Sequence, residues 1–177
     1  MRAAPLYSLS CFICFMLFGF SPLMADESQG FFEATGKYEG NYLCTAEVSG
    51  GLTFRNNTWQ GTSFIADKKY VVRIQSLNEI VGDSEWDRGM KYSVAIMQHG
   101  TGSDINQSGH ICSSRVNRDL KISISGVFTC WVSLNRWTMN LTTNRYLSAY
   151  FVGYTQADPE IRKNNTPNLE GGVCSKL

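Results

Sequence analysis

Residues 126–154 place the strongest constraint on what this chain can fold into. The segment is rich in aromatic and β-branched residues, and it is interrupted by hydroxyl-bearing and Asn residues rather than by helix caps. Residues 145–154 alternate between two sets of side chains, as a strand does, and both sets are largely apolar. Thr142-Thr143-Asn144 separates two such runs and is typical of a hairpin connection. We therefore predict that this segment forms the central antiparallel hairpin of an all-β domain.

The same alternation recurs along the chain. Residues 38–48, 70–75, 90–97 and 120–125 each place apolar side chains at every second position, and no helical period appears after residue 25. Polar, irregular residues 76–89 and glycine-rich residues 99–109 predict loops. About eight or nine short strands joined by turns favour an antiparallel up-and-down barrel of about eight strands, with lipocalin-like or avidin-like architecture. A two-sheet β-sandwich is the alternative.

Residues 1–25 have the layout of a secretory signal peptide. Arg2 is the basic residue at the start, an apolar run of roughly a dozen residues follows, and Pro22 precedes the small residue Ala25. That run is shorter than the roughly 20 residues that span a bilayer as a helix. We predict cleavage after Ala25 and a periplasmic or secreted location for the remaining chain.

Cleavage at that point would leave one neutral domain. The sequence has 177 residues, 16 basic and 15 acidic, and the first 25 contain Arg2 and no acidic residue. The expected mature chain, residues 26–177, is therefore a single β-barrel domain in which the charges balance. Nucleic acids and anionic membranes attract basic surfaces, so we expect neither as a partner. No later apolar run is long enough to span a membrane.

Four cysteines follow the predicted signal peptide: Cys44, Cys112, Cys130 and Cys174. An even number of cysteines in an exported domain predicts two disulfides, with three possible connectivities. We favour Cys44 with Cys174 and Cys112 with Cys130, because the first strand of a closed meander lies beside the last. The longer bridge would close a loop that stabilises the fold by up to about 5 kcal/mol in the chain-entropy model.

The two histidines, His99 and His110, flank the glycine-rich segment. With Cys112 or Asp104 they suggest a soft-metal site, but an oxidised Cys112 and two solvated histidines are the expected alternative. The acidic segment with Asp83, Glu85 and Asp87 lacks the glycine and glutamate positions of a calcium-binding loop. We expect no metal and no cofactor.

Motifs for catalysis are missing from the sequence. It has no G-x-S-x-G, no H-E-x-x-H and no phosphate-binding glycine loop. Paired carboxylates for glycoside chemistry have no linear signature, so the question of an enzyme stays open. A non-enzymatic protein is favoured.

Aromatic residues are the most suggestive feature for function. In a barrel, inward aromatic side chains with a few hydroxyls suit a small apolar or amphipathic ligand. The candidate lining residues for such a ligand are Trp59, Tyr70, Tyr92, Trp131 and Tyr150. The alternative is that these side chains only fill the core. The function we expect is therefore that of a non-enzymatic small-ligand binding protein.

A second hypothesis is a protein-binding module, such as an inhibitor or an envelope interaction factor. It would act on an envelope protein through residues 99–109 or through the acidic segment. Loops carry such functions because a rigid scaffold positions them.

Several short motifs accompany this architecture. They are G-K-Y-x-G-x-Y-x-C at residues 36–44, Gly50-Gly51 with Trp59, N-R-Y-L-x-x-Y-x-x-G-Y at residues 144–154, and T-P-x-x-x-x-G-x-C at residues 166–174. Together they resemble small exported bacterial proteins of unknown function. The resemblance implies a bacterial periplasm and carries no functional residues with it.

Overall fold

The structure is a computed structural model that describes residues 38–82, 89–114, 117–155, 157–158, 160 and 165–177. The predicted signal peptide, residues 1–25, lies outside the described residues. So do Asp83, Glu85 and Asp87 of the acidic segment. Within the described residues, no helix combines the length and the apolar character that crossing a bilayer requires.

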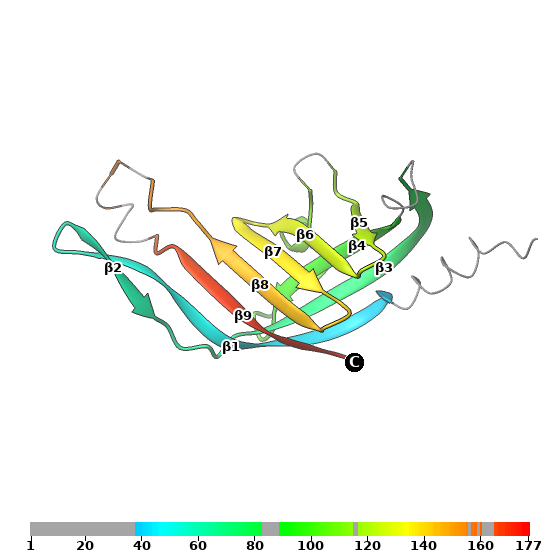
Figure 1. Cartoon of the computed structure of the whole chain (residues 1–177), viewed down its shortest axis with the longest axis horizontal. Helices are drawn as coiled ribbons and strands as arrows, with labels where there is room; N and C mark the ends of the chain where they lie inside the picture. Colours follow the sequence, from blue (N-terminus) through cyan, green and yellow to red (C-terminus); the bar gives the residue numbers. More distant parts are fainter. Residues whose placement is uncertain (1–37, 83–88, 115–116, 156, 159, 161–164) are drawn as a thin grey trace, which may run out of the picture.

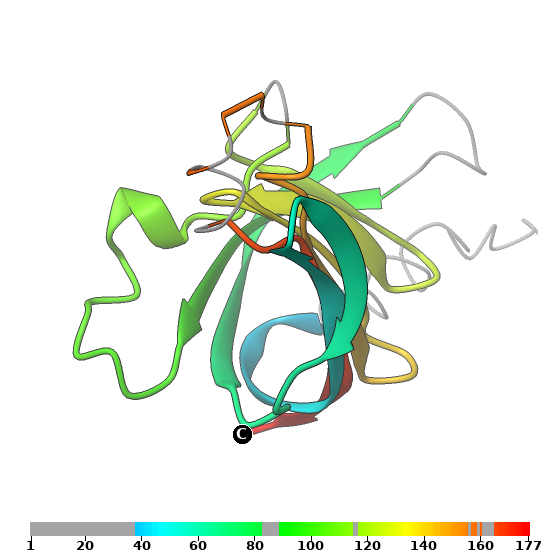
Figure 2. The ribbon, with the colours of Figure 1, turned by 90° about the vertical axis from the view of Figure 1, so that its left-hand side faces the viewer.

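The described residues form a nearly closed antiparallel barrel of eight strands, to which a ninth strand, β2, adds a hairpin (Figures 1 and 2). The strands are β1 Gly40–Arg55, β2 Thr58–Ser63, β3 Lys69–Val81, β4 Gly89–Gln98, β5 Leu120–Ser123, β6 Val127–Val132, β7 Asn135–Asn140, β8 Arg145–Tyr150 and β9 Asn168–Lys176. Their order in the sheet is β5-β4-β3-β1-β9-β8-β7-β6, and a short 3-10 helix, η2, spans Ser108–His110. The predicted fold class is confirmed.

Alternating side chains build the barrel as the sequence predicted. On β3 the inward residues Val72 and Ile74 are buried, and on β4 Tyr92, Val94 and Ile96 are buried in the same core. Side chains of β6, β7 and β8 complete this interior from the other side. An inside lined by apolar side chains and an outside that carries most charges is the arrangement that a period of two residues produces.

Residues 126–154 contain three successive strands, β6, β7 and β8, where a single hairpin was predicted. The predicted connection at Thr142-Thr143-Asn144 is present between β7 and β8. The side chain of Asn140 accepts hydrogen bonds from the backbone N–H groups of Thr142 and Thr143. A second tight turn contains Ser133, whose positive φ of 52° suits the reversal between β6 and β7.

The prediction of a loop throughout residues 76–89 was wrong in its first part. β3 continues to Val81 and pairs again with β4 through Ile80 and Val81. The ladder is irregular between Ser76 and Ile80, where Asn78 has a φ of 54°. Polar side chains in this bulge interrupt the alternation, so the strand was not visible in the sequence.

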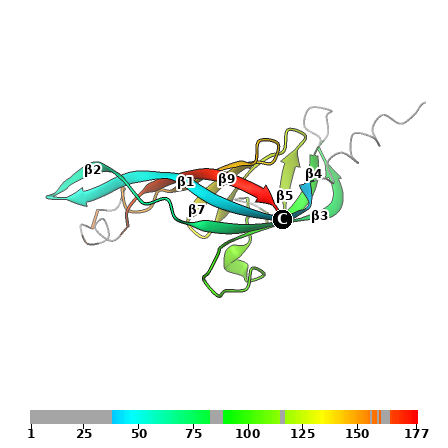
Figure 3. The same cartoon turned by 90° about the horizontal axis from the view of Figure 1, so that it is seen from below.

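A similar bulge changes the pattern of β1. Its pairing with β9 shifts between Ala46 and Val48, which leaves Val48 65% exposed although it belongs to the predicted apolar set. Residues 50–55 pair with β2, and beyond Gly51, the last residue of β1 that pairs with β9, this hairpin projects from one end of the barrel (Figure 3). Asn56 and Asn57 form its tip with φ values of 50° and 58°, as a tight hairpin turn requires.

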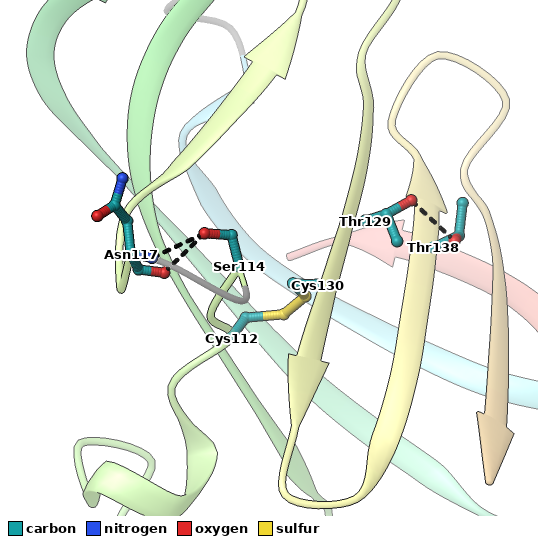
Figure 4. Close-up of a disulfide and its surroundings, with 6 residues drawn as sticks. All are labelled: Cys112, Ser114, Asn117, Thr129, Cys130 and Thr138. Carbon is teal, nitrogen blue, oxygen red and sulfur yellow. Dashed lines mark hydrogen bonds between the residues drawn. A yellow bond between two sulfur atoms is a disulfide. The ribbon is translucent and has the colours of Figure 1, made fainter. Parts of the chain in front are cut away.

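The barrel is completed at the seam between β4 and β6 by two segments. β5 pairs with the first half of β4, and Ile111 forms a bridge with Ala95 further along β4. Next to it, Ser113 exchanges two backbone hydrogen bonds with Trp131 of β6, with N to O distances of 3.0 and 2.8 Å. A disulfide between Cys112 and Cys130 joins the same segment to β6 (Figure 4).

The second disulfide joins the first and last strands of the barrel. Cys44 and Cys174 are direct partners in the β1–β9 ladder, with their Cα atoms 3.9 Å apart. The structure thus contains the two pairs that the topological argument favoured. Two disulfides are compatible with an extracellular or periplasmic location.

Candidate functional site

A polar cavity of about 350 Å³ lies at the end of the barrel from which the β1–β2 hairpin projects. It is formed where β3, β7 and β9 begin and where β8 ends. The lining residues are Lys68, Tyr70, Asn135, Ser148, Tyr150, Asn165, Thr166, Asn168 and Glu170. Most of them carry a hydroxyl or an amide. The volume is at the lower end of the range for small-molecule sites.

Strand register brings the deepest polar residues of this cavity together. Ser148 of β8 lies directly opposite Glu170 of β9. These two are the buried polar residues of the described chain, with 5% and 3% of their surfaces exposed. Directly opposite side chains in a sheet have Cβ atoms about 5 Å apart, so one small ligand can contact both.

The carboxylate of Glu170 is held by phenol groups. The hydroxyl of Tyr146 donates a hydrogen bond to Oε1 of Glu170 at 3.1 Å, and the phenol of Tyr70 also interacts with this carboxylate. Burial, and then the hydrogen bond and charge of Glu170, raise the pKa of both Tyr70 and Tyr146 far above the usual value for tyrosine. Both phenols therefore stay protonated and act as donors at neutral pH.

Lys68 provides the opposite charge at the edge of the cavity. Its Nζ lies 3.8 Å from Oε2 of Glu170, and 44% of its side chain is exposed. That separation is longer than the 2.7–2.9 Å of a charge-assisted hydrogen bond. The ammonium group thus balances the charge of Glu170 without occupying its full hydrogen-bonding capacity.

Aromatic side chains close the barrel interior below the cavity. The rings of Trp137 and Tyr146 stack with centroids 4.7 Å apart, and Tyr70 packs edge-on against Trp137 at 4.9 Å. Trp137 and Tyr146 are buried. Of these three rings, that of Tyr70 lines the cavity, and Trp137 and Tyr146 pack against it in the barrel core.

The hydroxyl of Ser148 makes no hydrogen bond to any residue that the structure describes, although it is buried in the cavity wall. Buried polar groups are usually hydrogen-bonded, because removing them from water otherwise costs free energy. By contrast, the hydroxyl of Tyr150 donates to Oδ1 of Asn165 at 2.8 Å and links β8 to the residues before β9. Ser148 is therefore available to a ligand.

The structure brings together two of the five candidate lining residues. Tyr70 and Tyr150 line the polar cavity. Tyr92 is fully buried in the core on β4, paired with Ser76 and Leu120 away from this barrel end. Trp131 is half-buried at an outward position of β6. Trp59 packs in the β1–β2 hairpin between Phe54 and Tyr154, with ring centroids 5.2 and 5.3 Å apart.

Sequence analysis did not identify Glu170, Ser148, Lys68 or Asn135. Glu170 lies in a short, glycine-rich last strand, and Ser148 lies in a strand where both faces are largely apolar. The only available signal is a pair of inward polar residues at matching positions of neighbouring strands. Such a pair can be recognised only when the register between β8 and β9 is known.

The two histidines do not form a site with other candidate ligands. His99 is exposed and His110 is half-buried, and the sulfur of Cys112 belongs to a disulfide. Within the described part of the chain, no three His, Cys, Asp or Glu residues are grouped so that they could hold a metal ion.

Comparison with known proteins gives no relative from which a function could be carried over. No protein-family model, curated protein sequence or solved structure matches this chain.

Proposed function

We propose that this protein is a non-enzymatic binding protein that holds a small amphipathic ligand in the cavity at the barrel mouth. The observation that carries the proposal is the pair of buried polar residues, Ser148 and Glu170, which are direct partners on neighbouring strands and both line the cavity. Tyr146 and Lys68 compensate for the burial of the Glu170 carboxylate, but a buried hydroxyl without a partner among the described residues, such as that of Ser148, opposes folding. A ligand that bonds to Ser148 removes this cost.

The lining favours an amphipathic ligand over a fully apolar one. Asn135, Asn165 and Asn168 contribute amide groups, while Tyr70 and Tyr150 contribute half-buried rings. Specific pockets commonly combine a few polar groups that orient the ligand with aromatic surface that removes its apolar part from water.

The proposal includes export to the periplasm or the extracellular space. The layout of residues 1–25 supports a signal peptide, and the two disulfides are compatible with an oxidising compartment. A carrier in such a compartment meets small polar molecules from outside the cell.

Native mass spectrometry tests this function with whichever small molecule the protein carries. The full chain is expressed for export in a bacterial host, and the native mass is compared with the denatured mass. We expect an added small mass that is lost on denaturation. Asn135→Phe should abolish it, because a larger ring at this inward position fills the cavity.

The matched control is Arg136→Phe, which places the same ring at the neighbouring, exposed position of β7. It should retain the added mass. A bare native mass for the wild-type protein, combined with no binding in the soluble-compound titrations described below, would overturn the proposed function. So would an adduct that persists unchanged in a folded Asn135→Phe variant.

A further inference from the structure

We infer that the ligand is a neutral, hydroxyl-rich molecule of the carbohydrate or polyol class, bound through two neighbouring hydroxyls by Ser148 and Glu170. This inference rests on the proposed function and specifies the chemistry that the cavity recognises. The residues that carry it are the two charges, the uncharged polar lining and the half-buried rings of the same cavity.

Charge balance in the cavity favours a neutral ligand. Among the described residues of its lining, Glu170 and Lys68 are the charged ones, and they lie 3.8 Å apart as an ion pair. An anionic ligand would approach the Glu170 carboxylate, and a cationic one would approach the Lys68 ammonium. Like charges in a partly buried site repel each other. A charged ligand is therefore attracted by one of these two residues and repelled by the other.

The hydrogen-bonding groups suit adjacent hydroxyls. A ligand hydroxyl can donate to the carboxylate of Glu170, and the neighbouring hydroxyl can bond to Ser148, which lies directly opposite on β8. Side-chain amides of Asn135 and Asn168 add both donors and acceptors to the wall. Hydroxyls act as donor and acceptor at once, so they match such a mixed lining better than an amine or a carboxylate does.

Two tyrosine rings provide the apolar surface that such a ligand needs. Tyr70 and Tyr150 are half-buried in the lining, and the Tyr150 hydroxyl is oriented by Asn165. A sugar ring carries C–H groups on its faces and hydroxyls at its edge. The rings therefore contact the faces, while Ser148 and Glu170 bind the edge.

Isothermal titration calorimetry with a matched set of sugars tests the inference. The set contains neutral hexoses, the corresponding hexosamines and hexuronic acids, and a neutral trisaccharide. We expect a neutral hexose to bind more tightly than its charged counterparts. If the trisaccharide binds more tightly than the hexose, the ligand is the end of a glycan chain. If the hexose binds more tightly, the ligand is a free sugar.

Variants separate the roles of the anchoring residues. Ser148→Ala and Glu170→Gln should each lower the affinity for the neutral sugar by about tenfold or more, because each removes one hydrogen bond in a buried site. Leu147→Ala, at the exposed neighbouring position of β8, is the control and should bind normally. Lys68→Met should shift preference toward the hexosamine, because it leaves Glu170 as the one charge among the described lining residues.

The outcomes distinguish this inference from the proposed function. Preference for a hexosamine, a hexuronic acid or a non-sugar compound by the wild-type protein, with binding still blocked by Asn135→Phe, would overturn the assignment of a neutral carbohydrate and leave the ligand site in place. Neutral sugar binding that a folded Ser148→Ala variant retains in full would also contradict it. Failure of every soluble compound, together with a bare native mass, would overturn both.

Discussion

Glu170 is the residue that distinguishes this barrel from one whose interior is only a core. A carboxylate with 3% of its surface exposed is unfavourable unless donors and an opposite charge compensate for lost water. Here Tyr70, Tyr146 and Lys68 provide that compensation from β3, β8 and the segment between β2 and β3. Three parts of the chain are thus arranged around one acidic group at the barrel mouth.

The phenols that hold Glu170 predict an alkaline limit to stability. Burial raises the pKa of Tyr70, Tyr146 and, to a lesser extent, Tyr42 in the folded protein above the value of about 10 for an unfolded chain. A raised pKa stabilises the fold fully below pH 10, and this contribution is lost as the pH rises above 10. We expect the free energy of unfolding to fall steeply above pH 10.

Phenolate absorbance, followed together with circular dichroism, measures this effect. Part of the phenolate absorbance should appear only at the pH at which the circular dichroism of the β-sheet is lost. Tyr70→Phe should reduce the absorbance that appears at this unfolding step. Complete ionisation of all phenols near pH 10, with the fold intact, would contradict the described burial.

At this scale the sequence analysis named two of the residues that line the candidate cavity. Tyr70 and Tyr150 were chosen because inward aromatic residues suit a ligand, and both line the cavity. Trp59 and Trp131 were chosen for the same reason but lie in a hairpin and on an outer face. A single strand pattern shows that a residue alternates, whereas which face is inside depends on bulges and register.

Among the elements, β9 determines how closely the barrel closes. It pairs with β1 on one side and β8 on the other, and its Gly171 and Gly172 lie where the β1 ladder shifts at a bulge. A β-carbon at Gly172 would overlap the carbonyl oxygen of Thr45, whereas one at Gly171 would make ordinary contacts, the nearest at 3.5 Å with Leu147. Gly172 is therefore required for β1 and β9 to approach each other.

Two alanine substitutions test that close approach. Gly172→Ala should destabilise the protein by about 1–3 kcal/mol, because the strands must separate to accommodate the methyl group. Gly171→Ala is the matched control and should change stability by less than about 1 kcal/mol. Urea unfolding measures both, and equal effects of the two substitutions would contradict the described β1–β9 pairing.

The elements themselves were largely predictable, while their irregularities were not. Alternation located β4 and the inward positions of β3, and Thr142-Thr143-Asn144 located the β7–β8 turn. The bulges in β1 and β3 were missed, because a bulge shifts the pairing without requiring a particular residue. The extension of β3 to Val81 is the clearest example.

For the molecule as a whole, the barrel closes because the last strand of the chain pairs with the first. β9 returns to β1, the Cys44–Cys174 disulfide joins them, and the Cys112–Cys130 disulfide fixes the seam between β4 and β6. This meander was predictable from the sequence because short connections favour pairing between neighbouring strands. Whether the interior is hollow was not predictable, since it depends on how Trp137, Tyr146 and Tyr70 pack together.

An amide chemical-shift map of the labelled protein tests the central claim most directly. The protein is titrated with a fixed set of neutral, cationic and anionic small polar compounds. For any compound that binds, we predict shifts clustered at Lys68, Tyr70, Ser148, Tyr150 and residues 165–170, around the cavity. Shifts confined to residues 99–109, or none with any compound, would contradict a ligand site at the barrel mouth.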